Sequence, residues 1–208
     1  MYIPAWFKEQ RLETLHALIR RYPFAPLVTE IDGAPFAGHF PFLLDSERGE
    51  FGTLRAHIAR LNPQWRGFGD GKEALVLFQG PHAYISPTWY AAGPAVPTWN
   101  YAVAHAYGVP RVVDDTALRA ILLETVATFE GQETRTRIPE EYFAKMALGV
   151  VGFEIEITRL EGKFKLSQNR SEEDRRRVIR ALQGSRRVGD RDTAEQMLAL
   201  APETRETA

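Results

Sequence analysis

The stretch from residue 153 to residue 158, FEIEIT, alternates strictly between apolar and polar side chains. Successive side chains of a β-strand point to opposite faces, so this period of two predicts a strand. We expect Phe153, Ile155 and Ile157 to lie on its buried face. The other face is then left for solvent or for a partner.

More strand patterns fill the middle of the chain. Residues 25–31 and 37–44 are apolar and flank the turn dipeptide Asp32-Gly33, which predicts a β-hairpin. Turn residues at short intervals are typical of a barrel or a sandwich. Additional strands are expected at residues 50–54, 74–79, 83–86 and 98–106.

Helical patterns stand on both sides of these strands. Apolar residues recur at helical spacing from Leu12 to Ile19, until Tyr22-Pro23 ends the pattern. A second helix is expected over residues 118–129, capped by Asp114 or Asp115 and stopped by Gly131. A short helix follows Pro139.

The composition changes at Ser171 to charged and helical, and Ser171 with Asp174 resembles a capping box. Another short helix is expected at residues 193–200. We therefore expect residues 1–170 to form the main domain. Residues 171–208 form a C-terminal helical extension packed on it.

The overall composition excludes several classes of site. The 208 residues carry a formal net charge of −1 and contain no cysteine, so disulfides and thiolate chemistry are excluded. The charged N-terminal residues lack the apolar run of a signal peptide or a membrane span. We expect a cytoplasmic protein that does not enter a membrane.

Two aromatic runs lie close together, GPHAYISPTWY at residues 80–90 and VPTWNYAVAH at residues 96–105. Surface loops seldom hold so many large flat side chains. One interpretation is a pocket wall for a planar ligand or a subunit interface. The other is that these rings simply fill a core.

The segment GTLRAHIARLNP, residues 52–63, carries a hydroxyl, potential cations and an amide. If a strand ends here and a helical turn begins, then Thr53, His57, Arg60 and Asn62 form a candidate phosphate site. The alternative is that the arginines are solvated and His57 is an ordinary half-buried histidine.

Common catalytic and metal motifs are missing from the sequence. The five histidines are isolated, so no metal site is expected, and no nucleophile elbow or nucleotide-binding glycine motif is present. The basic tract at residues 159–170, RLEGKFKLSQNR, either closes a pocket for an anion or forms a solvated edge.

Several of these strings together resemble one family. The sequences MYIP at residue 1, HFPF at residue 39, ARLNPQW at residue 59, AYISP at residue 83 and LSQNR at residue 166 are similar to those of the PaiB family. Its members are described as FMN-binding negative transcriptional regulators. The resemblance extends from Met1 to about Leu182.

The resemblance implies an α+β fold, a mostly antiparallel six-stranded split β-barrel with flanking helices, related to pyridoxamine-phosphate oxidase. It also implies a homodimer that holds FMN at the subunit interface. Two positions depart from the family pattern, since glycine is expected at Ala56 and a small residue at Leu61. An added methyl at residue 56 weakens close approach of a phosphate, if glycine is required there.

The implied cofactor residues fall into three groups. Thr53, His57, Arg60 and Asn62 belong to the phosphate segment. The strand His39–Phe42, including Phe40, meets the flavin through its backbone. The residues that border the ring or the partner chain are Trp99, Asn100, Lys165 and Gln168.

Two functions remain open. As a regulator, the protein binds DNA, and the candidate basic residues are Arg175, Arg176, Arg177, Arg180, Arg186 and Arg187. These arginines equally suit a solvated helix beside acidic residues, and no helix-turn-helix signature accompanies them. The alternative is an FMN-dependent oxidoreductase or flavin reductase without a DNA role, or less favoured, a haem-handling relative. The sequence identifies no catalytic residue.

Overall fold

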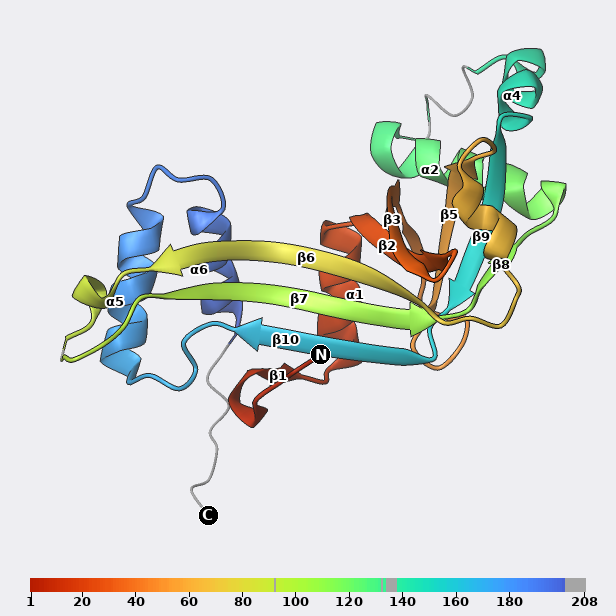
Figure 1. Ribbon diagram of the computed structural model, residues 1–208. Coiled ribbons are helices and arrows are strands. Elements are labelled where there is room, and N and C mark those ends of the chain that lie inside the picture. The colour runs from red at the N-terminus through yellow and green to blue at the C-terminus, as the bar shows by residue number, and fades with distance from the viewer. Residues whose placement is uncertain (92, 132, 134–137, 201–208) are drawn as a thin grey trace. The chain divides into compact units, whose positions relative to one another are not determined.

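The strands form two sheets in the computed structural model, which describes residues 1–91, 93–131, 133 and 138–200 (Figure 1). The strand order is β1-β10-β7-β6-β2-β3 in one sheet and β4-β5-β9-β8 in the other. The pairs β1–β10, β2–β3, β2–β6, β4–β5, β5–β9 and β8–β9 are antiparallel. The expected α+β class with a mostly antiparallel six-stranded sheet is confirmed.

The strand bounds are as follows. The first sheet contains β1 (Lys8–Glu9), β2 (Phe24–Ile31), β3 (Ala34–Pro41), β6 (Ala74–Ile85), β7 (Thr98–Gly108) and β10 (Arg159–Lys165). The second contains β4 (Leu43–Asp45), β5 (Thr53–Ala59), β8 (Pro110–Val112) and β9 (Val150–Glu156).

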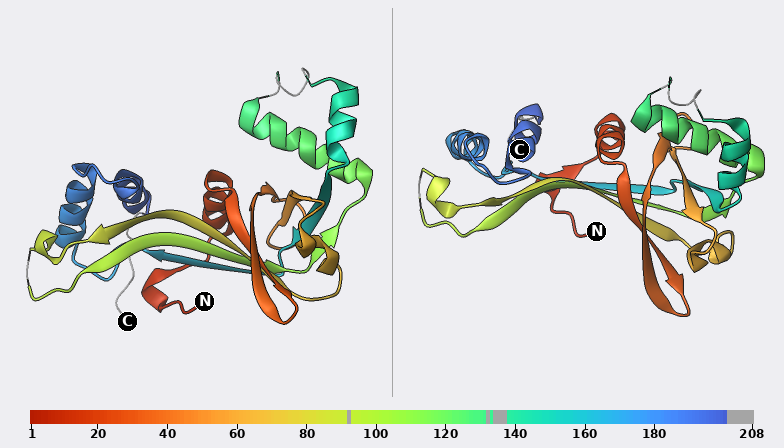
Figure 2. Two further views of the ribbon diagram at one scale, coloured as in Figure 1. Left: turned by 45° about the horizontal axis from the view of Figure 1, so that its top comes forward. Right: turned by 90° about the horizontal axis from the view of Figure 1, so that it is seen from above.

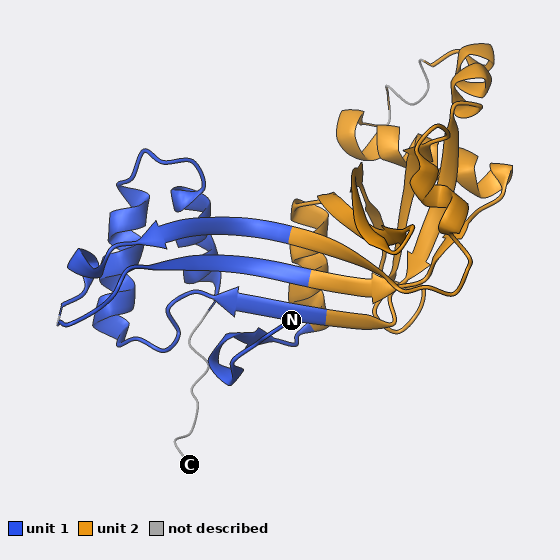
Figure 3. Cartoon of the chain, viewed as in Figure 1, with its two compact units in different colours: residues 1–11, 79–104, 161–208 blue, residues 12–78, 105–160 orange. Residues whose placement is uncertain are grey.

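Contacts divide the chain into two compact units (Figure 3). Unit 1 consists of residues 1–11, 79–104 and 161–208, and unit 2 of residues 12–78 and 105–160. The C-terminal helices therefore share a unit with parts of β6, β7 and β10. The division into domains at residue 170 stays a prediction.

The predicted hairpin is confirmed in unit 2. Ile31 of β2 pairs with Ala34 of β3 across the turn. Asp32 and Gly33 have φ angles of 52° and 77°. Two-residue hairpin turns of this kind need positive φ at both positions, which aspartate tolerates and glycine adopts without strain.

The core of unit 2 is built on the inner faces of β5 and β9. Leu54 and Ile58 of β5 are almost fully buried, as is Ile155 of β9. Phe153 of β9 lies among other aromatic rings, with its centroid 5.8 Å from that of Phe40. The other rings of this cluster are Phe42, Phe68 and Phe78.

Helices of unit 2 begin and end where local chemistry predicts. α1 (Leu12–Arg21) follows the predicted apolar pattern. Asp114 caps α2 (Asp115–Glu130) by accepting from the Ala117 N–H at 2.8 Å, and Gly131, with φ 89°, follows its last residue. α4 (Glu140–Ala147) follows Pro139. A 3₁₀ turn, η2, occupies Pro63–Gly67.

Unit 1 places α5 (Glu172–Gln183) and α6 (Asp190–Ala199) against each other and on the same side of β6 and β7 (Figure 2). Ser171 caps α5 by accepting from the Asp174 N–H, as the sequence predicts. The interior contains Ala83, Ile85, Ala102, Phe164, Leu166, Val178, Leu182, Ala194 and Met197. Two short 3₁₀ turns complete the unit, η1 (Ala5–Phe7) and η3 (Pro87–Trp89).

Two sequence predictions about strands were wrong. Residues 55–59 continue β5 and do not begin a helical turn, because Leu54, Ala56 and Ile58 alternate toward the core. Residues 74–85 form one strand where two were expected, since Gly80 and Pro81 are both buried within β6 and do not end it. Among the described residues, no helix is long and apolar enough to span a membrane.

Candidate functional site

The end of β5 carries the side chains that the phosphate hypothesis needs. Arg60 follows the last residue of β5, and its Nε and Nη2 donate to the carbonyl oxygens of Leu148 and Val150 at 2.8 and 2.9 Å. Carbonyl oxygens do not neutralise the guanidinium charge. Within the described residues Nη1 makes no further hydrogen bond, so the exposed cation retains donors for an anion.

Asn62 lies two residues beyond Arg60 and has a structural role as well. Its Oδ1 accepts from the Gln64 N–H at 2.9 Å and thereby caps η2. Its Nδ2 group has no acceptor in the described part of the chain, so it adds a donor at this end of β5.

His57 lies on the same strand, on the face opposite Leu54 and Ile58. Its Nδ1 is buried and has no hydrogen-bond partner among the residues that the structure describes. Burial lowers the pKa of the His57 imidazole below its usual 6.5. The ring is therefore neutral at pH 7, and its Nδ1 is a buried nitrogen without a partner in the described residues.

The lowered pKa predicts how stability depends on pH. The unfolded chain protonates His57 at higher pH than the folded chain, so acid favours unfolding. The stabilising contribution is complete above pH 6.5 and is lost as the pH falls below that value toward the folded-state pKa. Urea unfolding of the wild type and of His57→Gln at pH 7.5 and 5.5 should show a smaller acid loss in the variant. The other four histidines are common to both proteins, so equal losses would contradict this prediction.

Thr53 is not brought together with Arg60. A strand rises roughly 3.3 Å per residue, which separates the two ends of β5 by roughly 20 Å. The Thr53 hydroxyl is buried and donates to the carbonyl oxygen of Arg48 at 3.0 Å. Between these ends, Arg55 forms a bidentate ion pair with Glu124 of α2, at 2.8 and 2.9 Å.

β3 is the last strand in the order of its sheet, so one edge of its backbone faces away from β2. His39 is exposed and stacks on Phe24, with ring centroids 6.0 Å apart. Phe40, the next residue, is 7 % exposed and packs in the aromatic core. The edge thus offers backbone N–H and C=O groups held in place by a buried ring.

The remaining four predicted residues lie in unit 1. Lys165 donates to the Trp99 carbonyl oxygen at 2.6 Å and to the Thr98 hydroxyl at 2.5 Å. Burial, followed by the nearby charges of Lys163 and Arg170, lowers the pKa of Lys165. Trp99 is 53 % exposed beside this amine.

Asn100 and Gln168 make internal contacts. Asn100 is buried and donates to the Ser167 hydroxyl at 3.0 Å. Gln168 accepts from the Leu166 N–H at 2.7 Å and also donates to the Phe164 carbonyl. These two side chains shape the turn after β10, whereas Trp99 and Lys165 reach the surface.

Sequence reasoning missed two residues beside these groups. Gln64 is 1 % exposed, and its Oε1 has no donor within the described residues. A Cβ on Gly38 of β3 would lie 2.6 Å from that oxygen, so only glycine leaves this space open. Ser167 has φ 64°, an unusual conformation for serine. The only signal in the sequence was their place within the ARLNPQW and LSQNR strings.

These observations fit a flavin phosphate at the end of β5. Phosphate needs a cation and several hydrogen-bond donors, and Arg60 and Asn62 supply both with atoms not already paired within the described residues. His57 lies on β5, three residues before Arg60, and its unpaired Nδ1 is buried. The free edge of β3 and the unpaired oxygen of Gln64 are polar groups of the same unit, unit 2.

Comparisons with known proteins identify the family. Residues 1–159 match the family model described as "Putative FMN-binding domain". The chain is also 34 % identical over 201 residues to the protein "Protease synthase and sporulation protein PAI 2" of Bacillus subtilis, covering 95 % of this chain and 96 % of that one. The chain belongs to the PaiB family. For this PaiB protein the expected cofactor, FMN, is confirmed by the family model.

Solved structures support the fold of this PaiB chain. An FAD- and haem-binding protein from Mycobacterium smegmatis has a TM-score of 0.61 and 20 % identity, covering 76 % of this chain and 73 % of that one. The flavocytochrome Anf3 of Azotobacter vinelandii has a TM-score of 0.62 and 17 % identity, covering 81 % and 74 %. At these identities the likeness shows the fold alone, which is the split barrel expected from the sequence.

Proposed function

We propose that this chain binds FMN as a cytoplasmic homodimer and acts as a negative transcriptional regulator of the PaiB type. The observation that supports FMN binding most directly is the unpaired donor group at the end of β5. His57 Nδ1 is buried without a partner in the described chain, and Arg60, which follows the last residue of β5, retains its charge.

In this proposal the chain's own residues divide the work. Arg60 supplies the positive charge for the phosphate, and Asn62 and His57 supply neutral hydrogen bonds. The outer edge of β3, from His39 to Pro41, supplies backbone hydrogen bonds for the ring system, whereas the N–H of Phe42, the next residue, already donates to the Pro23 carbonyl oxygen. When bound, FMN supplies a redox-active ring that no amino-acid side chain can replace.

Thr53, Asn100 and Gln168 take a lesser part in this proposal, because their side chains already bond within the protein. Trp99 and Lys165 remain the proposed contacts for the ring or for the second chain of the homodimer. An exposed indole beside a half-buried amine suits either a planar anionic ligand or a subunit interface.

The regulatory role is supported by similarity. The B. subtilis relative is named for protease synthase and sporulation, and almost the whole of both chains aligns. Because PaiB members are described as negative transcriptional regulators, we extend that role to this protein and propose DNA as its partner.

The first test is an absorbance spectrum of the purified protein, followed by titration with FMN and light scattering with and without FMN. We expect flavin absorbance bands and a titration that ends near one FMN per chain. Light scattering should give the mass of two chains. A colourless protein that ignores added FMN would contradict the cofactor assignment. Steady NAD(P)H oxidation without any DNA binding would favour the alternative, an FMN-dependent oxidoreductase.

A further inference from the structure

The turn between α5 and α6 concentrates positive charge on a protein whose formal net charge is only −1. Residues 180–192 contain four arginines and two acidic residues, Asp190, which is buried, and Asp192, which is exposed. The four arginines are all exposed. They are Arg180, Arg186, Arg187 and Arg191, and we call them the arginine face.

The side chains of the arginine face make no ion pair with the residues that the structure describes. Other arginines of the same helix differ in this respect. Arg176 and Arg177 each pair with the glutamate four residues earlier. Arg175 is half-buried and donates to the carbonyl oxygens of Met197 and Leu200, which fixes α6 against α5. Of the arginines that the sequence suggests for DNA binding, Arg180, Arg186 and Arg187 therefore remain. The structure adds Arg191 to them.

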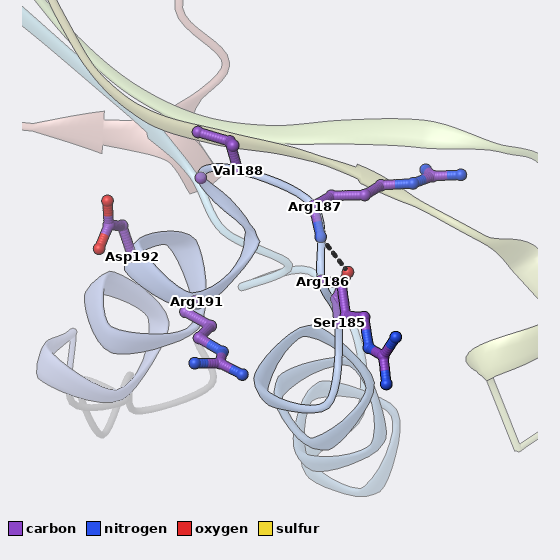
Figure 4. Close-up of a pocket in the computed structure, with 7 residues that line it drawn as sticks. Ser185, Arg186, Arg187, Val188, Arg191 and Asp192 are labelled. Carbon is purple, nitrogen blue, oxygen red and sulfur yellow. Dashed lines mark hydrogen bonds between the residues drawn. The ribbon is translucent and has the colours of Figure 1, made fainter.

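A cavity of about 380 Å³ opens at this turn and is lined by residues 185–189, 191 and 192. Figure 4 shows the side chains of Arg186 and Arg187 extending from the connection and that of Arg191 extending from α6, with their guanidinium groups apart from one another. They do not converge on a single point. A lone phosphate ion would engage only part of such a surface, whereas a row of phosphates would engage all of it.

We propose that the arginine face binds the phosphate backbone of duplex DNA. The inference rests on the proposed regulatory function and gives it a location. Duplex DNA carries one charge per about 1.7 Å of its axis, so spread and unpaired guanidinium groups match it by charge. Arginine is also the side chain best suited to phosphate oxygens.

The geometry favours contacts that position the protein on the DNA backbone over contacts that read the bases. The residues that join α5 to α6, 184–189, make a longer connection than the three- or four-residue turn of a helix-turn-helix motif. Contacts to phosphate fix the orientation of a protein on DNA but carry little sequence information. We therefore expect similar loss of affinity on different sequences when the arginine face is changed.

The experiment measures binding of a fluorescein-labelled 30-base-pair duplex across a series of salt concentrations. The test variant is Arg186→Gln with Arg187→Gln. Loss of two phosphate contacts should lower the slope of log affinity against log salt by about 1.8 and the affinity in 0.1 M salt by about tenfold or more. The matched control, Arg176→Gln with Arg177→Gln, removes the same charge from paired arginines and should change affinity less than about twofold.

The same proteins are titrated with FMN, which separates the two proposals. Wild type that binds FMN but not the duplex, even at 50 mM salt, would overturn this inference and leave the cofactor assignment intact. Equal effects of the test and control variants would overturn the location. Tighter binding to single-stranded RNA or to polyglutamate than to the duplex would overturn the choice of partner.

Discussion

Arg60→Gln should weaken FMN binding by roughly 10- to 150-fold, because a charge-assisted hydrogen bond contributes about 1.5–3 kcal/mol. The substitution removes the positive charge at the end of β5 while keeping a polar side chain. Adding His57→Ala should weaken binding further, since it removes a second proposed donor. Flavin fluorescence, measured as protein is titrated into FMN, gives the dissociation constants.

The matched control for Arg60→Gln is Arg48→Gln. Arg48 is also exposed, but it pairs with Glu154 at 2.9 Å, and its carbonyl accepts from Thr53 at the opposite end of β5. Equal weakening by both variants would mean that only overall charge matters. Arg60→Lys keeps the charge and should restore part of the affinity. If Arg60→Gln weakened binding only because the loop near Leu148 misfolds, Arg60→Lys would not restore it. FMN binding that is unchanged in Arg60→Gln would remove the phosphate assignment.

Local signals in the sequence predicted the elements that end at chemically distinct residues. Asp114, Gly131 and Ser171 mark helix ends, and Asp32-Gly33 marks a hairpin, because caps and turns depend on a few neighbouring residues. The strand β9 was equally clear from its alternation. Each of these features is decided within about six residues of chain.

The candidate site was harder to predict because its geometry depends on the exact length of β5. Thr53 and Arg60 look like neighbours in a short string if a helical turn begins between them. Leu54, Ala56 and Ile58 instead hold the segment extended against the core, so the two residues stand at opposite ends. The roles of Gln64 and Ser167 depend on distant partners, Leu27 on β2 and Asn100 on β7, which no local pattern reports.

Phe153→Ala should lower the free energy of unfolding by about 3–5 kcal/mol, as large-to-small changes of buried aromatic residues do. Phe153 is fully buried, and its ring centroid lies 5.0 Å from that of Phe68 and 6.1 Å from that of Phe42. Its strand pairs with β5 at Ala56, whose small side chain offers little to refill the space. Folded proteins are stable by about 5–15 kcal/mol, so this loss is a large fraction of the total. Equilibrium urea unfolding, followed by fluorescence, measures it.

Phe24→Ala is the control that makes the same chemical change on the surface. Phe24 is 67 % exposed and touches His39 by ring stacking, so its loss should cost no more than about 1 kcal/mol. Similar costs for the two variants would show that the cluster around Phe153 is not the stabilising core of unit 2. A large cost confined to Phe153 has a functional consequence as well. The ring of Phe40 packs edge-on against Phe153 and holds the strand whose edge is proposed to meet the flavin, so FMN affinity should fall in this variant even where it remains folded.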